Sequence, residues 1–267
     1  MQELVKWKLL DFEKIILECQ DIIAEVAITI KAEMNYDYYL LSSYAKAILN
    51  IREVLCLLHN GFPDGALSRA RNIYEQMIIM HFISRHKDEK DGYDLIDRYF
   101  DNQDIQSHYN NKLYYEELIN FNEESLSDIC NMEINRHNMS IKEFQNKYPD
   151  CKRFNDYWWA SKIINQPSFE KLQKVCNAGL FRVIYRRACI STHASAMGDF
   201  ALLGRDNPDG NILTTQETYE GFEMPICLSM DSFGIMTDIV FANFSLENTY
   251  TESLELICTE YRKHVFE

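Results

Sequence analysis

The residues best suited to chemistry lie in one short segment late in the chain, residues 181–195, which reads FRVIYRRACISTHAS and is expected to be helical. Positions seven apart in a helix lie about 20° apart around its axis. We therefore expect Arg186 and His193 on one face, with Arg182 on the same stripe. In a regular helix, Arg187 faces away from His193. This stripe of guanidinium and imidazole groups is the strongest candidate site in the sequence.

An imidazole close to a guanidinium group is suited to cleaving a phosphodiester bond. Histidine titrates near neutral pH, so His193 can take a proton from a ribose 2′-hydroxyl or give one to the leaving oxygen. Arginine holds and neutralises a phosphate through paired hydrogen bonds, a role that suits Arg186. We predict that Ser191 or Tyr185 positions the substrate. This chemistry uses no cofactor and no metal ion, and we predict none.

Two segments resemble an uncharacterised bacterial HEPN-like family, known only as a domain of unknown function. They are Gly65–Glu75 (GALSRARNIYE) and Tyr185–Ser195 (YRRACISTHAS), and the similarity covers roughly residues 40–200. The arginine and histidine of the second segment also resemble the signature of the HEPN superfamily (higher eukaryotes and prokaryotes nucleotide-binding). Proteins of this superfamily are helical and include many metal-independent ribonucleases.

The resemblance implies both a fold and a function. The implied fold is an antiparallel bundle of long helices. The implied activity is that of a metal-independent endoribonuclease, in which Arg186 or Arg187 works with His193 across a homodimer whose two late helices face each other. Many members of the superfamily act as toxins or in antiviral defence, so the resemblance also implies an effector of bacterial defence.

The same arginines and histidine have a second explanation, as a structural or ligand-binding pair. Arg52 and His59 have the same spacing in an earlier predicted helix, so the spacing alone is not specific. The alternative function is a non-catalytic helical module that binds a nucleotide or a partner protein. In that case a local basic cluster binds RNA or a nucleotide without cleaving it.

Arg71 and Glu75 lie four residues apart on a predicted helix that is otherwise apolar. Their spacing is typical of an ion pair within one helix. A second hypothesis is that Glu75 reaches the helix of residues 182–193 and holds an arginine or histidine there. Under that hypothesis, Arg71 and Glu75 support the candidate site from behind.

An acidic stripe follows at steps of three and four residues and consists of Asp94, Asp97, Asp101, Asp104 and His108. Carboxylates and an imidazole at these spacings can bind a divalent metal ion. However, the sequence lacks the repeated Glu-x-x-His pattern of helical di-metal proteins. We therefore predict no metal site, and interpret the stripe as a solvated face or as a contact for a basic partner protein.

The overall composition restricts the possible partners. The chain has 267 residues and a formal net charge of −14, so its surface as a whole repels phosphate backbones and anionic lipids. Binding of RNA therefore requires a local basic cluster, or a symmetric assembly that brings such clusters together. The sequence contains no Gly-rich phosphate loop.

The cysteines and the N-terminus favour a cytoplasmic location. The eight scattered cysteines form no CxxC pair and no zinc spacing, as expected for thiols in a reducing compartment. Glu3, Asp11 and Glu13 interrupt the N-terminal stretch where a signal peptide needs apolar residues. No run of about 18 apolar residues is apparent, so we expect no membrane-spanning segment.

Apolar residues at steps of three and four predict an all-α fold, and a total of only 9 Gly and 5 Pro argues against an all-β fold. We expect a single domain over residues 1–267, with a HEPN-like core at about 36–203 between long flanking helices. The expected helices cover about residues 3–33, 36–59, 64–84, 93–109, 113–135, 169–194, 214–244 and 250–264.

Local signals mark some of the boundaries. Asn60-Gly61-Phe62-Pro63 is expected to end the second helix, with Asp64 as the N-cap of the third. Ser168 is expected to cap the helix at 169–194, which is interrupted near Gly179. Residues 136–167 are expected to form short helices and a packed loop. Their aromatic cluster is interpreted as a core anchor, with base stacking as the alternative, and consists of Tyr157, Trp158 and Trp159.

Overall fold

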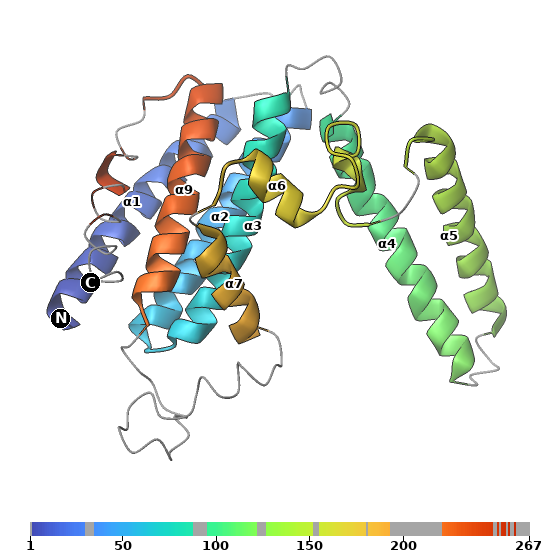
Figure 1. Cartoon of the computed structure of the whole chain (residues 1–267), viewed down its shortest axis with the longest axis horizontal. Coiled ribbons are helices and arrows are strands. Elements are labelled where there is room, and N and C mark those ends of the chain that lie inside the picture. Colours follow the sequence, from blue (N-terminus) through green and yellow to red (C-terminus); the bar gives the residue numbers. More distant parts are fainter. Residues whose placement is uncertain are drawn as a thin grey trace. The chain divides into compact units, whose positions relative to one another are not determined.

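Figure 1 shows the computed structural model of the chain, in which every described element is a helix. The all-α prediction is therefore confirmed for the described residues, while the HEPN-like arrangement stays a prediction. The structure describes residues 2–29, 35–87, 95–121, 127–151, 155–179, 181–192, 221–247, 250, 252–254, 256 and 259.

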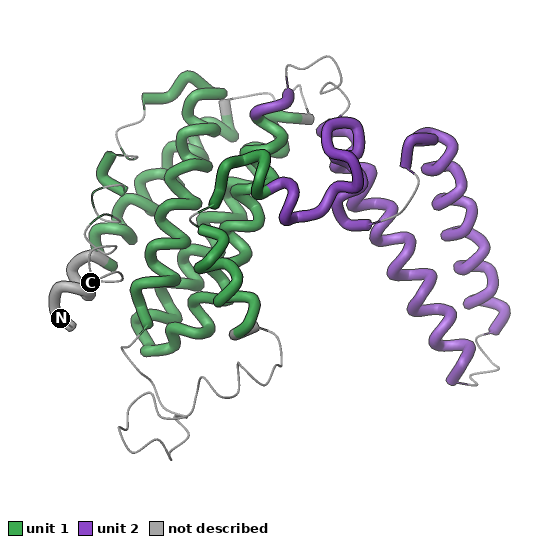
Figure 2. The backbone as a smooth tube through the Cα atoms, viewed as in Figure 1, with its two compact units in different colours: residues 1–84, 173–267 green, residues 85–172 purple. Residues whose placement is uncertain are grey.

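The chain divides into two compact units, which Figure 2 shows in different colours. Unit 1 consists of residues 1–84 and 173–267, and unit 2 of residues 85–172. Unit 2 therefore lies, in the sequence, between the two halves of unit 1. The expectation of a single domain over residues 1–267 stays a prediction.

Unit 1 is built around α2 (Asn35–His59), which packs against α1 (Gln2–Thr29) and α9 (Glu223–Asn243). α1 and α2 each bury one apolar face because their apolar residues recur at steps of three and four, whereas α9 is buried on most of its sides. Helix α3 (Pro63–His86) lies beside α2, to which it is joined by an ion pair of 2.8 Å between Arg69 Nε and a carboxylate oxygen of Glu53 on α2.

The turn between α2 and α3 has the geometry of a glycine-terminated helix. Gly61 adopts a left-handed φ of 77°, and Phe62 N–H and Gly61 N–H donate hydrogen bonds back to the carbonyls of Leu57 and Leu58. The prediction for Gly61 is thus confirmed. The prediction that Asp64 is the N-cap of α3 is wrong, because the carbonyl of Phe62 already accepts the hydrogen bond from Ala66 N–H. Pro63 is the first residue of α3, a position that suits its fixed φ and missing N–H.

Helix α9 supplies much of the core of unit 1. Tyr44 of α2 is fully buried, stacks on Phe233 of α9 at 4.9 Å between ring centroids, and shares a hydrogen bond of 2.7 Å with Thr237 Oγ1. α9 is long and apolar enough to cross a membrane, although we expected no such segment. Its most apolar 18-residue window is 72% buried inside the protein, and core helices of soluble proteins pass the same test. The absence of a membrane span stays a prediction.

Unit 2 contains a hairpin of two long helices, α4 (Leu95–Asn120) and α5 (Ser127–Lys147), that pack against each other. The predicted break after residue 109 is wrong, because the polar run at 110–112 contains no Gly or Pro to stop α4. The predicted irregular stretch from residue 136 is also wrong as far as Lys147. The apolar signal of α5 is weak because only one narrow face is buried, through Cys130, His137 and Phe144.

The remainder of unit 2 is anchored by tryptophans. A short 3-10 helix, η2 (Trp158–Ala160), packs against α4. Both of its tryptophans are 1% exposed, and Tyr99 of α4 meets Trp159 edge-on at 5.2 Å between ring centroids. The interpretation of the tryptophans as core anchors is confirmed, whereas Tyr157 is only half-buried.

The later helices follow the predicted boundaries in part. The interruption near Gly179 is confirmed, since α6 (Phe169–Val175) and α7 (Phe181–Thr192) are separate helices. Ser168 caps α6, because its carbonyl accepts the N–H of Leu172 at 3.0 Å. The first part of the helix expected at 214–244 lies outside the described residues, as does most of the helix expected at 250–264.

Candidate functional site

Helix α7, which carries the predicted site, packs with one face and exposes the other. Ala188 is fully buried, whereas Val183 is 67% exposed. Arg186 and Arg187 are both exposed. α7 makes contacts with α9, so it belongs to the packed part of unit 1. Its arginines are therefore presented on a helix that is held in place.

Aromatic rings join α7 to α3. Tyr74 of α3 is fully buried, and its ring centroid lies 5.2 Å from that of Tyr185 and 6.3 Å from that of Phe181. The Tyr74 hydroxyl accepts a hydrogen bond of 3.0 Å from Gln173 Nε2. Burial raises the pKa of Tyr74 to about 12, so its hydroxyl stays protonated. This ring cluster fixes which edge of α7 faces α3.

A polar contact lies beside these rings and consists of Arg71, Glu75 and Tyr185. Glu75 Oε1 accepts a hydrogen bond of 2.8 Å from Arg71 Nε, on the same helix, and one of 2.9 Å from the Tyr185 hydroxyl on α7. The Arg71 guanidinium carbon lies 5.6 Å from the centroid of the Tyr185 ring. We call these three residues the α3–α7 clasp.

The charges of the clasp support one another. Burial raises the pKa of Tyr185 strongly, and the negative charge of Glu75 raises it further. The phenol therefore stays a hydrogen-bond donor throughout the accessible pH range. The positive charge of Arg71 balances the carboxylate, whose side chain is 31% exposed. As a result, the half-buried carboxylate is stabilised without any arginine of α7.

The arginines of α7 differ in their contacts. Arg187 Nη1 lies 3.6 Å from the Met224 sulfur atom on α9, a weak hydrogen bond. Arg182 is half-buried, and its positive charge partly opposes the rise in the pKa of Tyr74 that burial causes. Arg186 has no hydrogen bond or ion pair to any part of the chain that the structure describes. Arg186 is thus the group of α7 best placed to bind an external anion.

The structure brings some predicted site residues together and leaves others apart. Glu75 contacts two of the predicted residues. It binds Arg71 as the expected pair within one helix, and it binds Tyr185 as a link to α7. The partner of Glu75 on α7 is a tyrosine, where the sequence suggested an arginine or histidine. His193 and the side chain of Ser191 lie outside the described residues. Their pairing with the arginines of α7 stays a prediction.

Sequence reasoning missed three residues around this junction. Tyr74 and Gln173 form the buried support beneath Tyr185, and Met224 contacts Arg187 from α9. The sequence carries one signal for Tyr74. It directly precedes Glu75, and apolar residues typical of a buried helix begin again at Met77. Gln173 and Met224 could not be found, because they are brought to α3 and α7 only by the fold.

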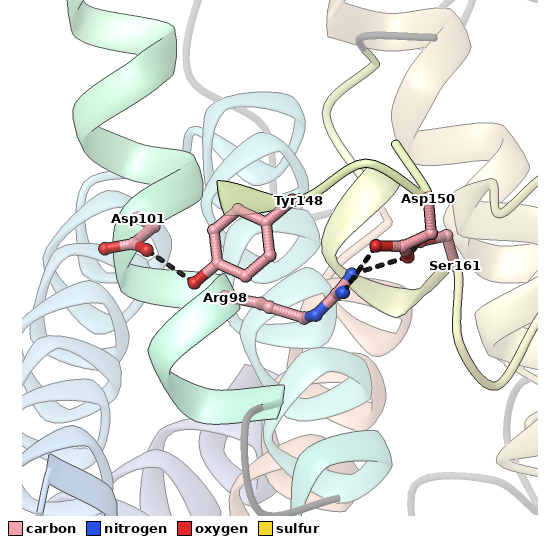
Figure 3. Close-up of polar contacts among 5 residues, drawn as sticks. All are labelled: Arg98, Asp101, Tyr148, Asp150 and Ser161. Atoms are coloured by element: carbon pink, nitrogen blue, oxygen red, sulfur yellow. Dashed lines mark hydrogen bonds and ion pairs between the residues drawn. The ribbon is translucent and has the colours of Figure 1, made fainter. Parts of the chain in front are cut away.

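Two members of the acidic stripe of unit 2, Asp101 and His108, are engaged in structural contacts. Figure 3 shows Asp101 bound to Tyr148, whose hydroxyl donates a hydrogen bond of 2.5 Å, and Lys147 Nζ binds the same carboxylate oxygen at 2.6 Å. At the end of the stripe, His108 Nδ1 shares a hydrogen bond of 2.9 Å with His137 Nδ1. Asp94 lies outside the described residues. Among the residues that are described, no group of three or more His, Cys, Asp or Glu is placed to hold a metal ion.

A buried arginine is the centre of the polar network in unit 2. The Arg98 side chain is 3% exposed and binds Asp150 through two parallel hydrogen bonds of 2.7 and 2.9 Å, as Figure 3 shows. Ser161 Oγ donates a third hydrogen bond to the same carboxylate. These bonds lower the pKa of Asp150, with the contribution of Arg98 the largest. The Arg98 guanidinium is buried and bound to Asp150, so it is not accessible to an external ligand.

The fold and the α3–α7 junction define an all-helical protein in which an arginine-bearing helix is fixed to its neighbour by a tyrosine and a glutamate. The model of a family of unknown function, DUF5677, matches residues 37–211, which is more than half of the chain. The chain therefore belongs to this family. No curated protein and no solved structure matches the chain. The matched range includes both the α3 and the α7 sides of the clasp.

Proposed function

We propose that the protein is a HEPN-like, metal-independent endoribonuclease. The observation that carries the proposal is Arg186, an exposed guanidinium with no partner among the described residues, on a helix that Tyr185 ties to Glu75. A guanidinium that needs no internal partner is available for the phosphate of a substrate. In a protein of net charge −14, Arg186 is a local positive charge at which an anion can bind.

In the proposed mechanism, Arg186 binds the scissile phosphate and neutralises the charge that develops on it. His193, one helical stripe away by its spacing, takes the proton of the 2′-hydroxyl or gives one to the leaving oxygen. Arg187, on another side of α7, is the alternative phosphate ligand. We further propose that two copies bring their α7 helices together, since a homodimer concentrates basic groups that one acidic chain dilutes.

The biological role we propose is that of a toxin-like or antiviral effector in the bacterial cytoplasm. The cysteines of the described residues are all free thiols, which supports a reducing compartment. Acidic residues of unit 2 are a candidate contact for a basic partner protein, and Asp97 and Asp104 remain exposed there. Such a partner offers one way to restrain or target a ribonuclease.

The competing proposal is a non-catalytic helical module that binds a nucleotide or a partner. One observation favours it: Arg71, Glu75 and Tyr185 satisfy one another within a single chain, as structural residues do. The two proposals differ in what they require of His193. Cleavage needs its imidazole, whereas binding by arginine does not.

The deciding experiment is incubation of the purified full chain with total cellular RNA, beside a His193→Ala variant. We expect the wild type to degrade RNA in the presence of a metal chelator and the variant to lose about 100-fold or more of the rate. Equal cleavage by both samples points to a contaminating nuclease. No cleavage by either sample removes the ribonuclease proposal and leaves the binding module.

A further inference from the structure

We propose that Glu75 is a positioning residue of the α7 site, which through the Tyr185 hydroxyl sets the orientation in which α7 presents Arg186. This inference rests on the proposed ribonuclease function and adds to it a requirement on α3. Glu75 itself does not touch the substrate. It acts by fixing the helix that does.

The contact is suited to this task because it joins two helices that are far apart in sequence. The bond from the Tyr185 hydroxyl to Glu75 Oε1 is 2.9 Å long and spans 110 residues of chain. It is a hydrogen bond to a charged acceptor, which is about twice as strong as one between neutral groups. Tyr185 is half-buried, so water competes only partly for the bond.

The position of Tyr185 on α7 converts this bond into control of Arg186. Neighbouring residues in a helix project about 100° apart, so fixing one of them fixes the direction of the next. Tyr185 holds one side of α7 to α3, and Arg187 meets Met224 of α9 on another side. With the helix held at these points, Arg186 is directed away from both neighbours, in agreement with its exposure.

The charge arrangement explains why a glutamate serves here without weakening the site. A lone carboxylate next to α7 would attract its arginines and compete with phosphate. Arg71 prevents this, because its Nε already binds Glu75 Oε1 at 2.8 Å and balances the charge. The clasp therefore holds α7 through the tyrosine and leaves Arg186 to the substrate.

The test uses steady-state cleavage of a short fluorescein-labelled RNA of mixed sequence by the full chain. Tyr185→Phe keeps the ring that packs on Tyr74 and removes only the hydroxyl. We expect kcat to fall about tenfold or more with KM changed less than about threefold, because a small misplacement of catalytic groups is costly for rate but not for binding. Glu75→Ala is expected to behave in the same way.

Two further variants separate positioning from stability. Glu75→Gln keeps an oxygen that accepts the tyrosine hydroxyl, so it is expected to retain about half or more of the wild-type kcat. Glu53→Gln breaks the comparable ion pair between α2 and Arg69 of α3, away from α7, and is expected to leave kcat unchanged. Circular dichroism at the assay temperature selects conditions in which every variant is folded.

The outcomes distinguish the positioning role of Glu75 from the ribonuclease activity. If the wild type cleaves RNA and folded Tyr185→Phe and Glu75→Ala cleave it equally fast, the positioning role is overturned and the ribonuclease proposal stands. If Glu53→Gln slows cleavage as much as Glu75→Ala does, the effect is general to α3 and the positioning role is again overturned. If the wild type does not cleave RNA at all, both proposals are overturned.

Discussion

Two guanidinium groups of this protein lie in opposite circumstances. Arg98 in unit 2 is 3% exposed and has both ends of its guanidinium fork on Asp150, 52 residues away. Arg186 in unit 1 is exposed on α7 and has no partner among the described residues. Arg98 is bound to a carboxylate inside the protein, whereas Arg186 is bound to none of the described groups. Arg98 therefore serves the stability of unit 2, whereas binding of an external anion by Arg186 is what we propose for α7.

The same contrast holds for the neighbouring groups. In unit 2, Lys147 and Tyr148 both bind Asp101, and the two imidazoles His108 and His137 bind each other. At the α3–α7 junction, Glu75 is bound by Arg71 and Tyr185, and Arg186 takes no part in these bonds among the described residues. A functional role for the acidic stripe therefore has to use the charges that remain exposed, and not the groups that hold the hairpin together.

The largest expected effect is on the stability of unit 2. Arg98→Ala leaves Asp150 without its main partner and removes a buried side chain, so we expect a loss of about 3 kcal/mol in the free energy of unfolding. Urea unfolding followed by tryptophan fluorescence measures this loss, because Trp158 and Trp159 lie in the same unit. A loss below about 1 kcal/mol contradicts the structural role assigned to this arginine.

At the α3–α7 junction the corresponding effect on stability is smaller. Tyr185→Phe removes one hydrogen bond to a half-buried carboxylate, and we expect a loss of about 1 kcal/mol in the free energy of unfolding. Circular dichroism during urea unfolding measures it. A loss as large as that for Arg98→Ala would mean that the clasp is a main support of the fold, and would erase the difference between the two regions.

A pH effect is expected in unit 2 and not at the clasp. His137 is 1% exposed, and burial together with the positive charges of His108 and Arg136 lowers its pKa, while Glu133 opposes the shift. The folded state thus favours the neutral imidazole, and the unfolded chain takes up the proton first. The stability that this pair contributes is complete above a pH of about 6.5 and is lost as the pH falls toward the lowered pKa.

Unfolding by urea at a series of pH values between neutral and mildly acidic conditions checks this direction. His137→Gln keeps a polar side chain of similar size and is expected to flatten the dependence over that range. A wild type that becomes more stable as the pH falls from neutral contradicts the assignment. Tyr185 is expected to contribute nothing in this range, because its pKa is raised far above neutrality.

The smallest effect is expected at the exposed edge of unit 2. Lys147 binds Asp101 at 2.6 Å, yet its side chain is 60% exposed, and exposed ion pairs contribute little. Lys147→Ala is therefore expected to change the free energy of unfolding by about 0.5 kcal/mol or less. A loss near that of Arg98→Ala in the same urea experiment would show that the exposed edge is as important as the buried arginine.

The sequence predicts the helices of unit 1 well and those of unit 2 poorly. Gly61 and Pro63 mark the boundary between α2 and α3 unambiguously, and long apolar stripes define the helices on either side. The helices of the unit 2 hairpin are polar overall and bury few residues, some of them polar, so their apolar pattern is sparse in the sequence. Polar residues at 110–112 look like a loop in the sequence, but they do not break a helix.

The site was predictable only as far as local spacing reaches. Arg71 with Glu75 and Arg182 with Arg186 follow from the geometry of one helix. The bond from Tyr185 to Glu75 spans 110 residues, and nothing local distinguishes this tyrosine from other tyrosines of the chain. The pairing of distant groups depends on how helices pack, which a single sequence does not specify.

Whether Arg186 binds RNA is tested most directly by comparing it with Arg52, which has the same sequence spacing to a histidine. Fluorescence anisotropy with a 2′-O-methyl RNA of mixed sequence measures binding without cleavage, for the full chain and for Arg186→Gln and Arg52→Gln. Arg52 is also exposed and precedes His59 by seven residues, but lies on α2. We predict that Arg186→Gln weakens binding about tenfold and Arg52→Gln less than about twofold. Equal affinities of the two variants, or a wild type that does not bind this RNA, would contradict the account.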